Sequence, residues 1–164
     1  MLIALSGLPG VGKTAIAREL ARELSAVHVR VDSIEQALRR AGMTVEGEGY
    51  EVARAVALDN LRVGRTVIAD CVNPWPLTRD EWRAVAGHAS VAVLEVEIVC
   101  SDADEHRRRV ESRVADIPGH QVPTWREVVE RDYRAWTRPR LVVDSGRHTV
   151  EESARAIVAA VPAR

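Results

Sequence analysis

The chain carries a single lysine, and that lysine lies inside a glycine-rich motif. Residues 7–14 read GLPGVGKT, which fits the pattern GxxxxGK followed by Ser or Thr. The other 22 of the 23 lysine and arginine residues are arginines. Lysine is a compact charge on a flexible stem that can follow a tight loop to the β- and γ-phosphates of a nucleotide, whereas arginine is a broad planar fork. The motif therefore predicts a nucleotide-phosphate site around Lys13.

Each part of this motif has an expected contact with the nucleotide. Glycines let successive backbone N–H groups turn toward the phosphates, and the start of the following helix adds the positive end of its dipole. The Thr14 hydroxyl is the expected direct ligand of Mg²⁺. The residues predicted to contact the nucleotide here are Gly7, Gly10, Val11, Gly12, Lys13, Thr14 and Ala15.

An aspartate follows each of two other apolar runs. Asp70 comes directly after residues 67–69, where an acid at the end of a strand beside the phosphate loop would hold the waters of the metal. Asp32 follows residues 27–31 and could accept the proton of a substrate hydroxyl that attacks the γ-phosphate. The alternatives are a plain turn residue at Asp70 and an N-terminal helix cap at Asp32.

Residues 106–113 read HRRRVESR, a dense cationic stretch with helical character. Arg109 and Arg113 are four positions apart, so we expect them to project from one helix face. A solvated charged face is the ordinary meaning of such a run. Because an irregular segment follows it, we interpret residues 109–123, approximately, as a lid that closes over the nucleotide and excludes water.

The elements that must position these residues alternate between strands and helices. Val- and Ile-rich strands are predicted at residues 2–6, 27–31, 66–69, 91–100 and 141–143. Helices are predicted after residue 13, from 48 to 62, where Gly64 ends the helix, and from 124 to 136. Helix starts are also predicted at Ser or Thr residues that are followed three positions later by an acid or amide, at positions 33, 78, 101, 124 and 149. This order predicts an α/β fold, a three-layer α/β/α sandwich around a five-stranded parallel sheet, in which ligands gather at the carboxyl ends of the strands.

Composition narrows the function classes. The 164 residues fit a single domain, and the formal net charge of −1 argues against a protein whose main task is to grip a nucleic-acid backbone. Cys71 and Cys100 have no metal-ligand spacing, and no apolar run reaches membrane-spanning length. The first strand begins at residue 2 and leaves no room for a signal peptide. We expect a cytoplasmic monomer or homodimer without membrane contact.

Together these residues resemble the small P-loop kinases, an AAA_33-like group that includes nucleotide monophosphate, shikimate, gluconate and chloramphenicol kinases and the kinase domain of bacteriophage polynucleotide kinase. Residues 67–73, 122–123 and 131–133 look most like the last of these. The resemblance implies the strand order 2-3-1-4-5, ATP with Mg²⁺, and catalytic roles for Lys13, Asp32 and Arg113. It also implies that Arg109 stacks on adenine, that Arg113 contacts phosphates, and that Gly146 and His148 belong to the loop at the adenine edge.

The acceptor half departs from that resemblance at one position. In polynucleotide kinase an arginine that reads the acceptor's phosphate follows the second-strand aspartate by three residues, and here that position is Glu35. A carboxylate there would repel a phosphorylated acceptor. Residues 33–62, approximately, form the expected acceptor segment, with acceptor contacts from Asp32, Glu35, Asn73 and Trp75.

The leading interpretation is an ATP-dependent kinase of a small-molecule hydroxyl, with a neutral or cationic acceptor. Two alternatives stay open. The first is a polynucleotide 5'-hydroxyl kinase, and the second is a P-loop ATPase or regulatory switch that phosphorylates nothing.

Overall fold

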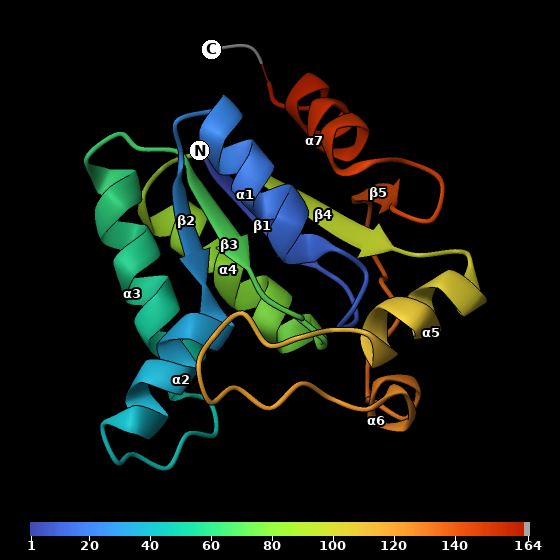
Figure 1. Ribbon diagram of the computed structural model, residues 1–164. Coiled ribbons are helices and arrows are strands. Elements are labelled where there is room, and N and C mark those ends of the chain that lie inside the picture. Colours follow the sequence, from blue (N-terminus) through green and yellow to red (C-terminus); the bar gives the residue numbers. More distant parts are fainter. Residues whose placement is uncertain (163–164) are drawn as a thin grey trace.

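Five strands alternate with seven helices in residues 1–162, the part of the chain that the computed structural model describes (Figure 1). Within this part no helix is both long enough and apolar enough to cross a membrane. The elements in chain order are β1 Leu2–Ser6, α1 Lys13–Glu23, β2 Val27–Arg30, α2 Val31–Arg40, α3 Glu48–Arg62, β3 Val67–Asp70, α4 Pro76–His88, β4 Val93–Val99, α5 Ala103–Glu111, α6 Trp125–Val129, β5 Leu141–Asp144 and α7 Val150–Ala159.

The strands form one parallel sheet in the order β2-β3-β1-β4-β5. In the central strand, Leu2 lies opposite Val67 of β3 on one side and Val93 of β4 on the other. All five residues of β1 are buried, as expected for a strand covered on both faces. The predicted α/β fold and strand order are therefore confirmed.

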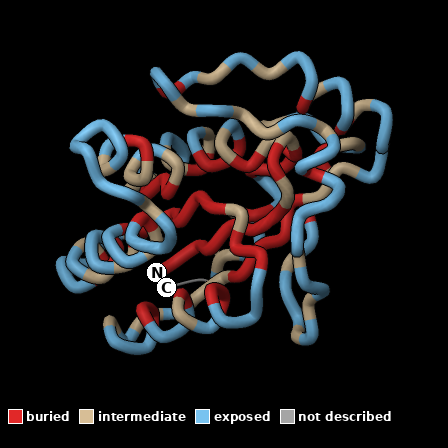
Figure 2. Tube along the Cα trace, turned by 90° about the horizontal axis from the view of Figure 1, so that it is seen from below, coloured by how far each residue is buried: buried red, intermediate tan, exposed pale blue. Residues whose placement is uncertain are grey.

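Side chains of β1 alternate between two hydrophobic clusters, one on each face of the sheet. Ile3 and Leu5 pack with residues of α1 and α7, whereas Leu2 and Ala4 pack with residues of α3 and α4. Figure 2 shows the buried strands between the helices. Because all strands run in the same direction, their carboxyl ends meet at one edge, where the phosphate loop and α5 and α6 also lie (Figure 1).

Element boundaries agree closely with the prediction, but three helix caps do not. Helix α3 has the predicted bounds and is followed by Gly64 at φ +81°, and the capping boxes at Thr124 and Thr149 are present. The predicted caps at Ser33, Thr78 and Ser101 are wrong. Helix α2 begins at Val31 after an extended Arg30, α4 begins at Pro76, whose ring suits the first helical position, and Asp102 caps α5 by accepting from the Glu105 N–H.

The helix predicted for residues 124–136 is also too long, because α6 ends at Val129. Beyond it the chain follows an irregular path whose side chains bind strand β4. The Tyr133 hydroxyl donates to Glu97 at 3.0 Å, and Arg138 donates twice to Glu95, at 2.6 and 2.9 Å. These tertiary bonds satisfy two buried carboxylates, so they outweigh a weak local preference for helix.

Candidate active site

The phosphate loop between β1 and α1 has a backbone that requires glycine. Gly7, Gly10 and Gly12 have φ angles of +138°, +86° and +90°. A Cβ at Gly7 would lie 2.2 Å from the carbonyl oxygen of Ile98, and one at Gly10 would lie 2.4 Å from a methyl carbon of Val110. The glycines therefore serve both the turn and the close packing of the loop against β4 and α5.

Lys13 is the first residue of α1, and its side chain folds back along the loop. Only 8% of the residue is exposed, and Nζ donates to the carbonyl oxygen of Leu8 at 2.8 Å. Burial lowers the pKa of Lys13 from 10.5 to about 8, although the carboxylates of Asp70 and Asp32 oppose this shift. The ammonium group is thus poorly solvated and lies among groups that would surround the terminal phosphates.

We expect ATP binding to be linked to protonation of Lys13. The phosphate charges of ATP favour the ammonium form of Lys13. Above pH 8 the free protein has released this proton, so ATP binding must take it up again. The affinity for ATP should therefore fall by up to about tenfold per pH unit. Calorimetry at pH 9 in two buffers of different ionisation enthalpy measures this uptake. The same measurement at pH 7 is the control, because Lys13 is then protonated in both the free and the ATP-bound protein. Equal heats in both buffers at pH 9 would contradict the linkage.

Asp70 ends β3 beside the loop and is 3% exposed. His28 Nε2 lies 3.1 Å from its Oδ2. Burial opposes ionisation of Asp70, but the hydrogen bond from His28, the charge of Lys13 and a hydrogen bond from the Thr14 side chain outweigh it and hold its pKa below the usual value. An ionised carboxylate next to a threonine hydroxyl is an oxygen donor set of the kind that Mg²⁺ prefers, so Thr14 and Asp70 fit the metal.

Asp32 lies in the first turn of α2, because β2 ends at Arg30 and not at Val31 as predicted. Its side chain is 36% exposed, and its Oδ2 lies 3.8 Å from the Arg30 guanidinium. Asp32 also contributes to the charge felt by Lys13. A carboxylate that is accessible and close to the phosphate loop can accept a proton from a bound hydroxyl.

A cleft of about 1380 Å³ joins these groups to the acceptor segment. The predicted site residues that line it are Gly10, Gly12, Lys13, Thr14, Ala15, Asp32, Glu35, Asp70, Trp75 and Arg113. In the part of the chain that the structure describes, six others lie outside its lining: Gly7, Val11, Asn73, Arg109, Gly146 and His148. The cleft thus brings the predicted donor and acceptor groups together.

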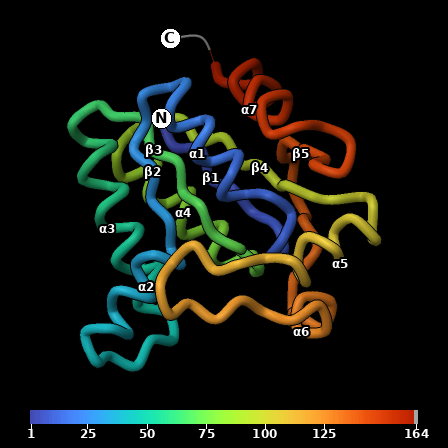
Figure 3. Tube along the Cα trace, viewed as in Figure 1, coloured from blue at the N-terminus to red at the C-terminus, as the bar shows by residue number. Residues whose placement is uncertain are grey.

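The segment between α5 and α6 covers the carboxyl edge of the sheet. Figure 3 shows it running from α5 across to α2 and back to α6. Gln36 of α2 donates to the Pro118 carbonyl at 3.4 Å, and Arg30 donates twice to Asp116. Residues 113–123 include several that line the cleft. That these residues act as a lid stays a prediction.

The two arginines of the predicted lid pair do not share a helix face. Helix α5 ends at Glu111, so Arg113 lies beyond it and lines the cleft. Arg109 donates to Glu105 at 2.7 Å and to the side chain and carbonyl of Ser145 at 3.1 and 3.0 Å. The prediction of one shared face is therefore wrong. Arg113 lies on the phosphate side and Arg109 on the side of the loop after β5.

The loop after β5 lies beside the phosphate loop. The Ser145 Oγ donates to the Val99 carbonyl at 3.0 Å, and the Ser145 Cβ would be 4.0 Å from a Cβ at Gly12. The Gly146 N–H donates to Asp144 Oδ1 at 3.0 Å. The His148 side chain is 55% exposed, and its Nδ1 is 3.9 Å from Glu152. Contacts from Gly146 and His148 to an adenine stay predictions.

Two predicted acceptor residues follow β3 and point in different directions. Asn73 has φ +53° and is 1% exposed, and its side chain donates inward to Ser6 Oγ at 3.2 Å while its N–H donates to the Tyr50 hydroxyl at 3.1 Å. Trp75 is 46% exposed and lines the cleft, and its indole N–H donates to Asp132 at 3.0 Å. Asn73 thus supports the loop after β3 from the protein interior, whereas the Trp75 ring forms part of the cleft wall.

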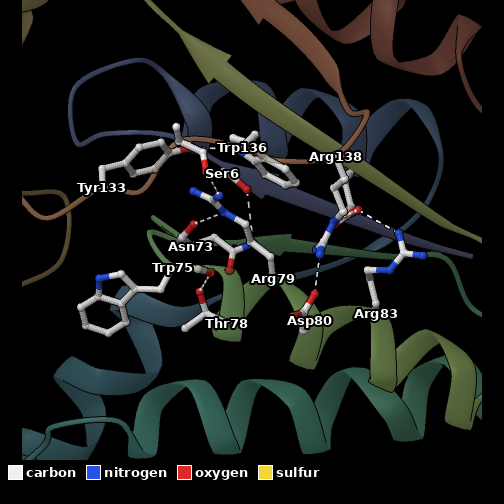
Figure 4. Close-up of polar contacts among 12 residues, drawn as sticks. Ser6, Asn73, Trp75, Thr78, Arg79, Asp80, Arg83, Tyr133, Trp136 and Arg138 are labelled. Carbon is white, nitrogen blue, oxygen red and sulfur yellow. Dashed lines mark hydrogen bonds and ion pairs between the residues drawn. The ribbon is translucent and has the colours of Figure 1, made fainter.

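A buried arginine holds the loop that carries Trp75 in place. Arg79 of α4 is 2% exposed and lies over the rings of Trp136 and Tyr133, at 4.2 and 5.1 Å from their centroids (Figure 4). Its guanidinium donates to backbone carbonyls on both sides, those of Asn73, Pro74, Arg134 and Ala135. Arg79 therefore ties the loop after β3 to the segment that follows α6.

We expect Arg79→Ala to lower the free energy of unfolding by about 3 kcal/mol, because it leaves buried carbonyls without their charged donor and removes two cation–π contacts. Urea unfolding measures the change. Arg83→Ala on the same helix is the matched control. Its side chain is 51% exposed and pairs with Glu95, so its loss should cost less than about 1 kcal/mol. Equal effects of the two substitutions would contradict the role of Arg79.

Several residues of the site were not predicted from the sequence. His28 supports Asp70, and His106 donates from Nε2 to the Pro9 carbonyl of the phosphate loop at 2.8 Å. Arg30 and Asp116 pair across the cleft although they are 86 positions apart. Only His28 and Arg30 had a usable signal, since polar residues in a buried strand need partners.

Comparisons with known proteins identify the family of the chain. The AAA_33 family model, described as an AAA domain, matches residues 2–132. The chain is 28% identical to a probable bifunctional SAT/APS kinase 2 of Sorangium cellulosum, over 96% of this chain but only 28% of that protein. It is 26% identical to a probable adenylyl-sulfate kinase of Aeropyrum pernix, over 93% of this chain and 87% of that protein.

A solved structure shares the fold over nearly its whole length. The APS kinase of Mycobacterium tuberculosis, in complex with AMPPNP and APS, superposes with a TM-score of 0.74 at 19% identity, covering 96% of this chain and 95% of that one. The predicted resemblance to small P-loop kinases, which are ATP-dependent phosphotransferases, is confirmed. The chain belongs to the AAA_33 family and has the P-loop kinase fold.

Proposed function

We propose that the chain transfers the γ-phosphoryl group of ATP to a hydroxyl of a small molecule that carries no phosphate near the reacting group. The observation that carries the proposal is that a single cleft is lined by Lys13, Asp70 and Asp32 together with the acceptor segment. A phosphate donor and a hydroxyl acceptor can therefore meet in one cleft.

The donor half neutralises phosphate charge. The loop amides and the Lys13 ammonium bind the β- and γ-phosphates, and Arg113 adds a second positive charge as negative charge develops in the transition state. Thr14 and Asp70 would hold Mg²⁺, which when bound would supply positive charge against the negative charge of the phosphates. Because burial deprives the Lys13 ammonium group of water, a negatively charged phosphate is a favourable partner for it.

Asp32 is the proposed base of the acceptor half. The substrate hydroxyl donates its proton to the Asp32 carboxylate, its oxygen bonds to the γ-phosphorus, and the bond from that phosphorus to the bridging oxygen breaks to release ADP. The 36% exposure of the Asp32 side chain supports access by a substrate. Residues 113–123 cover this half and would exclude water as a competing acceptor.

The charge of the acceptor segment supports a neutral or cationic substrate. Glu35, Glu46, Glu48 and Glu51 all line the cleft. Part of this charge is compensated, because Arg39 donates to Glu35 at 3.0 Å and Arg54 donates to Glu51. Trp75 offers an exposed ring as a wall for the acceptor. A hydroxylated sugar, cyclitol or antibiotic has the required chemistry.

A screen for ADP release tests the proposal. Wild-type protein is assayed with ATP, Mg²⁺ and panels of hydroxylated metabolites, antibiotics and 5'-hydroxyl oligonucleotides, with Lys13→Ala as the blank. We expect at least one small molecule to raise ADP release above both the blank and the rate without acceptor. Stimulation by oligonucleotides alone would favour the polynucleotide kinase, and ATP hydrolysis that no acceptor changes would favour the regulatory ATPase.

A further inference from the structure

Three charged side chains from distant parts of the chain form a network at the acceptor side of the cleft. Arg30, at the end of β2, donates through both terminal nitrogens to the two carboxylate oxygens of Asp116, at 2.7 and 3.0 Å. Arg18 of α1 donates to the same carboxylate at 2.6 Å. All three residues line the cleft, and Asp116 lies in the segment between α5 and α6. The Arg30–Asp116 pair has the bidentate geometry by which arginine binds carboxylates and phosphates.

The network is shielded from solvent at Arg30. The Arg30 side chain is 6% exposed, whereas those of Arg18 and Asp116 are 50% and 37% exposed. Among residues 1–162, the Arg30 Nε has no hydrogen-bond acceptor, and the next acid is Asp32 at 3.8 Å. Asp116 therefore accepts the hydrogen bonds from both terminal nitrogens of Arg30. A guanidinium group this buried is stable only with such an anion beside it.

The charge of Asp116 is maintained by its partners. The hydrogen bond from Arg30 outweighs partial burial and, with Arg18, holds the pKa of Asp116 far below its usual value. The two arginines thus favour the ionised form of this carboxylate.

We propose that Asp116 is an internal anion bound in a seat, the anion site formed by the Arg30 and Arg18 side chains. Asp116 thereby holds residues 113–123 over the cleft and keeps phosphate-bearing acceptors out of it. The consequence for acceptor choice rests on the proposed function, but the seat itself does not. A phosphorylated acceptor could use Arg30 only by displacing Asp116. It would then also meet Glu35, which lines the same cleft.

Sulfate is a suitable probe of the seat, because it is a tetrahedral dianion that needs no knowledge of the acceptor. Binding is measured by calorimetry with a saturating non-hydrolysable ATP analogue and Mg²⁺, so that the phosphate loop is already occupied. We expect no saturable sulfate site in the wild type. Asp116→Ala should bind one sulfate at least about tenfold more tightly, and Arg30→Ala in that background should abolish the site.

Asp80→Ala is the matched control, since it makes the same change in net charge but removes a carboxylate paired with Arg138 outside the cleft. It should leave sulfate binding at the wild-type level. Circular dichroism melts establish that each variant is folded, and Asp116→Asn, which keeps the side-chain volume, replaces Asp116→Ala if that variant unfolds.

Hydrogen exchange tests the second part of the proposal. Amides of residues 113–123 should exchange at least about tenfold faster in Asp116→Ala than in the wild type or Asp80→Ala, because the segment loses its two arginine partners. The proposal is overturned if wild type and Asp116→Ala bind sulfate equally, or if the exchange of residues 113–123 is the same in both. Since no acceptor is used, failure of the acceptor screen would leave these results interpretable.

Discussion

Replacing Lys13 with alanine should reduce kcat for phosphoryl transfer by about 100- to 1000-fold, the usual cost of removing one preorganised charge from a transition state. Lys13 contributes the ammonium group nearest the expected phosphates, and it is the only lysine in the chain. Arg18, Arg30 and Arg109 cannot take over this role, because Arg18 and Arg30 are bound to Asp116 and Arg109 to Glu105. Steady-state rates of ADP release measure the loss.

The same substitution should not destabilise the fold. Burial lowers the pKa of Lys13 from 10.5 to about 8, so at neutral pH the folded state carries a poorly solvated charge that the unfolded chain solvates fully. Between pH 8 and 10.5 the unfolded chain binds the extra proton, and stability from this group rises with pH. We therefore expect Lys13→Ala to melt at the wild-type temperature or above it at pH 7. A variant that melts normally and keeps more than a tenth of the wild-type kcat would remove Lys13 from the mechanism.

Asp32→Asn should lower kcat for transfer by about 100- to 10,000-fold, the range found for loss of a general base, while ATP affinity changes little. The amide keeps the size of the carboxylate but cannot accept the substrate proton. Asp32 is one of the charges that favour the ammonium form of Lys13, so a small weakening of ATP binding is expected from that source. Transfer rates and nucleotide affinity, measured separately, distinguish the two effects.

Asp59→Asn is the matched control for this experiment. Asp59 is an exposed residue of α3 that lies outside the lining of the cleft, and its replacement makes the same change in charge. It should leave both kcat and ATP affinity unaltered. Transfer by Asp32→Asn at a rate near that of Asp59→Asn would exclude Asp32 as the base.

Local patterns predicted most of the fold because its determinants are local. Runs of apolar residues such as 2–6 specify buried parallel strands, and Gly64 ends α3 by adopting a positive φ that few other residues tolerate. The error at residues 130–136 has the opposite cause. Tyr133 and Arg138 are bound to glutamates of β4, and this tertiary pairing is invisible to a helical pattern in the segment itself.

The candidate site divides in the same way. Lys13 and Thr14 were predictable because the glycine-rich motif specifies them, and Asp70 because it ends a strand beside that motif in a parallel sheet. Arg113 was misplaced on a helix because α5 ends at Glu111, between Arg109 and Arg113. The pairing of Arg30 with Asp116 joins residues 86 positions apart, and no spacing rule indicates such a contact.

The central claim is that the terminal phosphate of ATP becomes bonded to a hydroxyl oxygen of a small molecule. The most direct test is to incubate wild-type protein with γ-labelled ATP, Mg²⁺ and each acceptor that raises ADP release, and to identify the labelled product by mass spectrometry. The account predicts label on the acceptor in amounts equal to the ADP formed, and at least about 100-fold slower labelling with Lys13→Ala. Label found only in inorganic phosphate, with every acceptor unchanged, would contradict it.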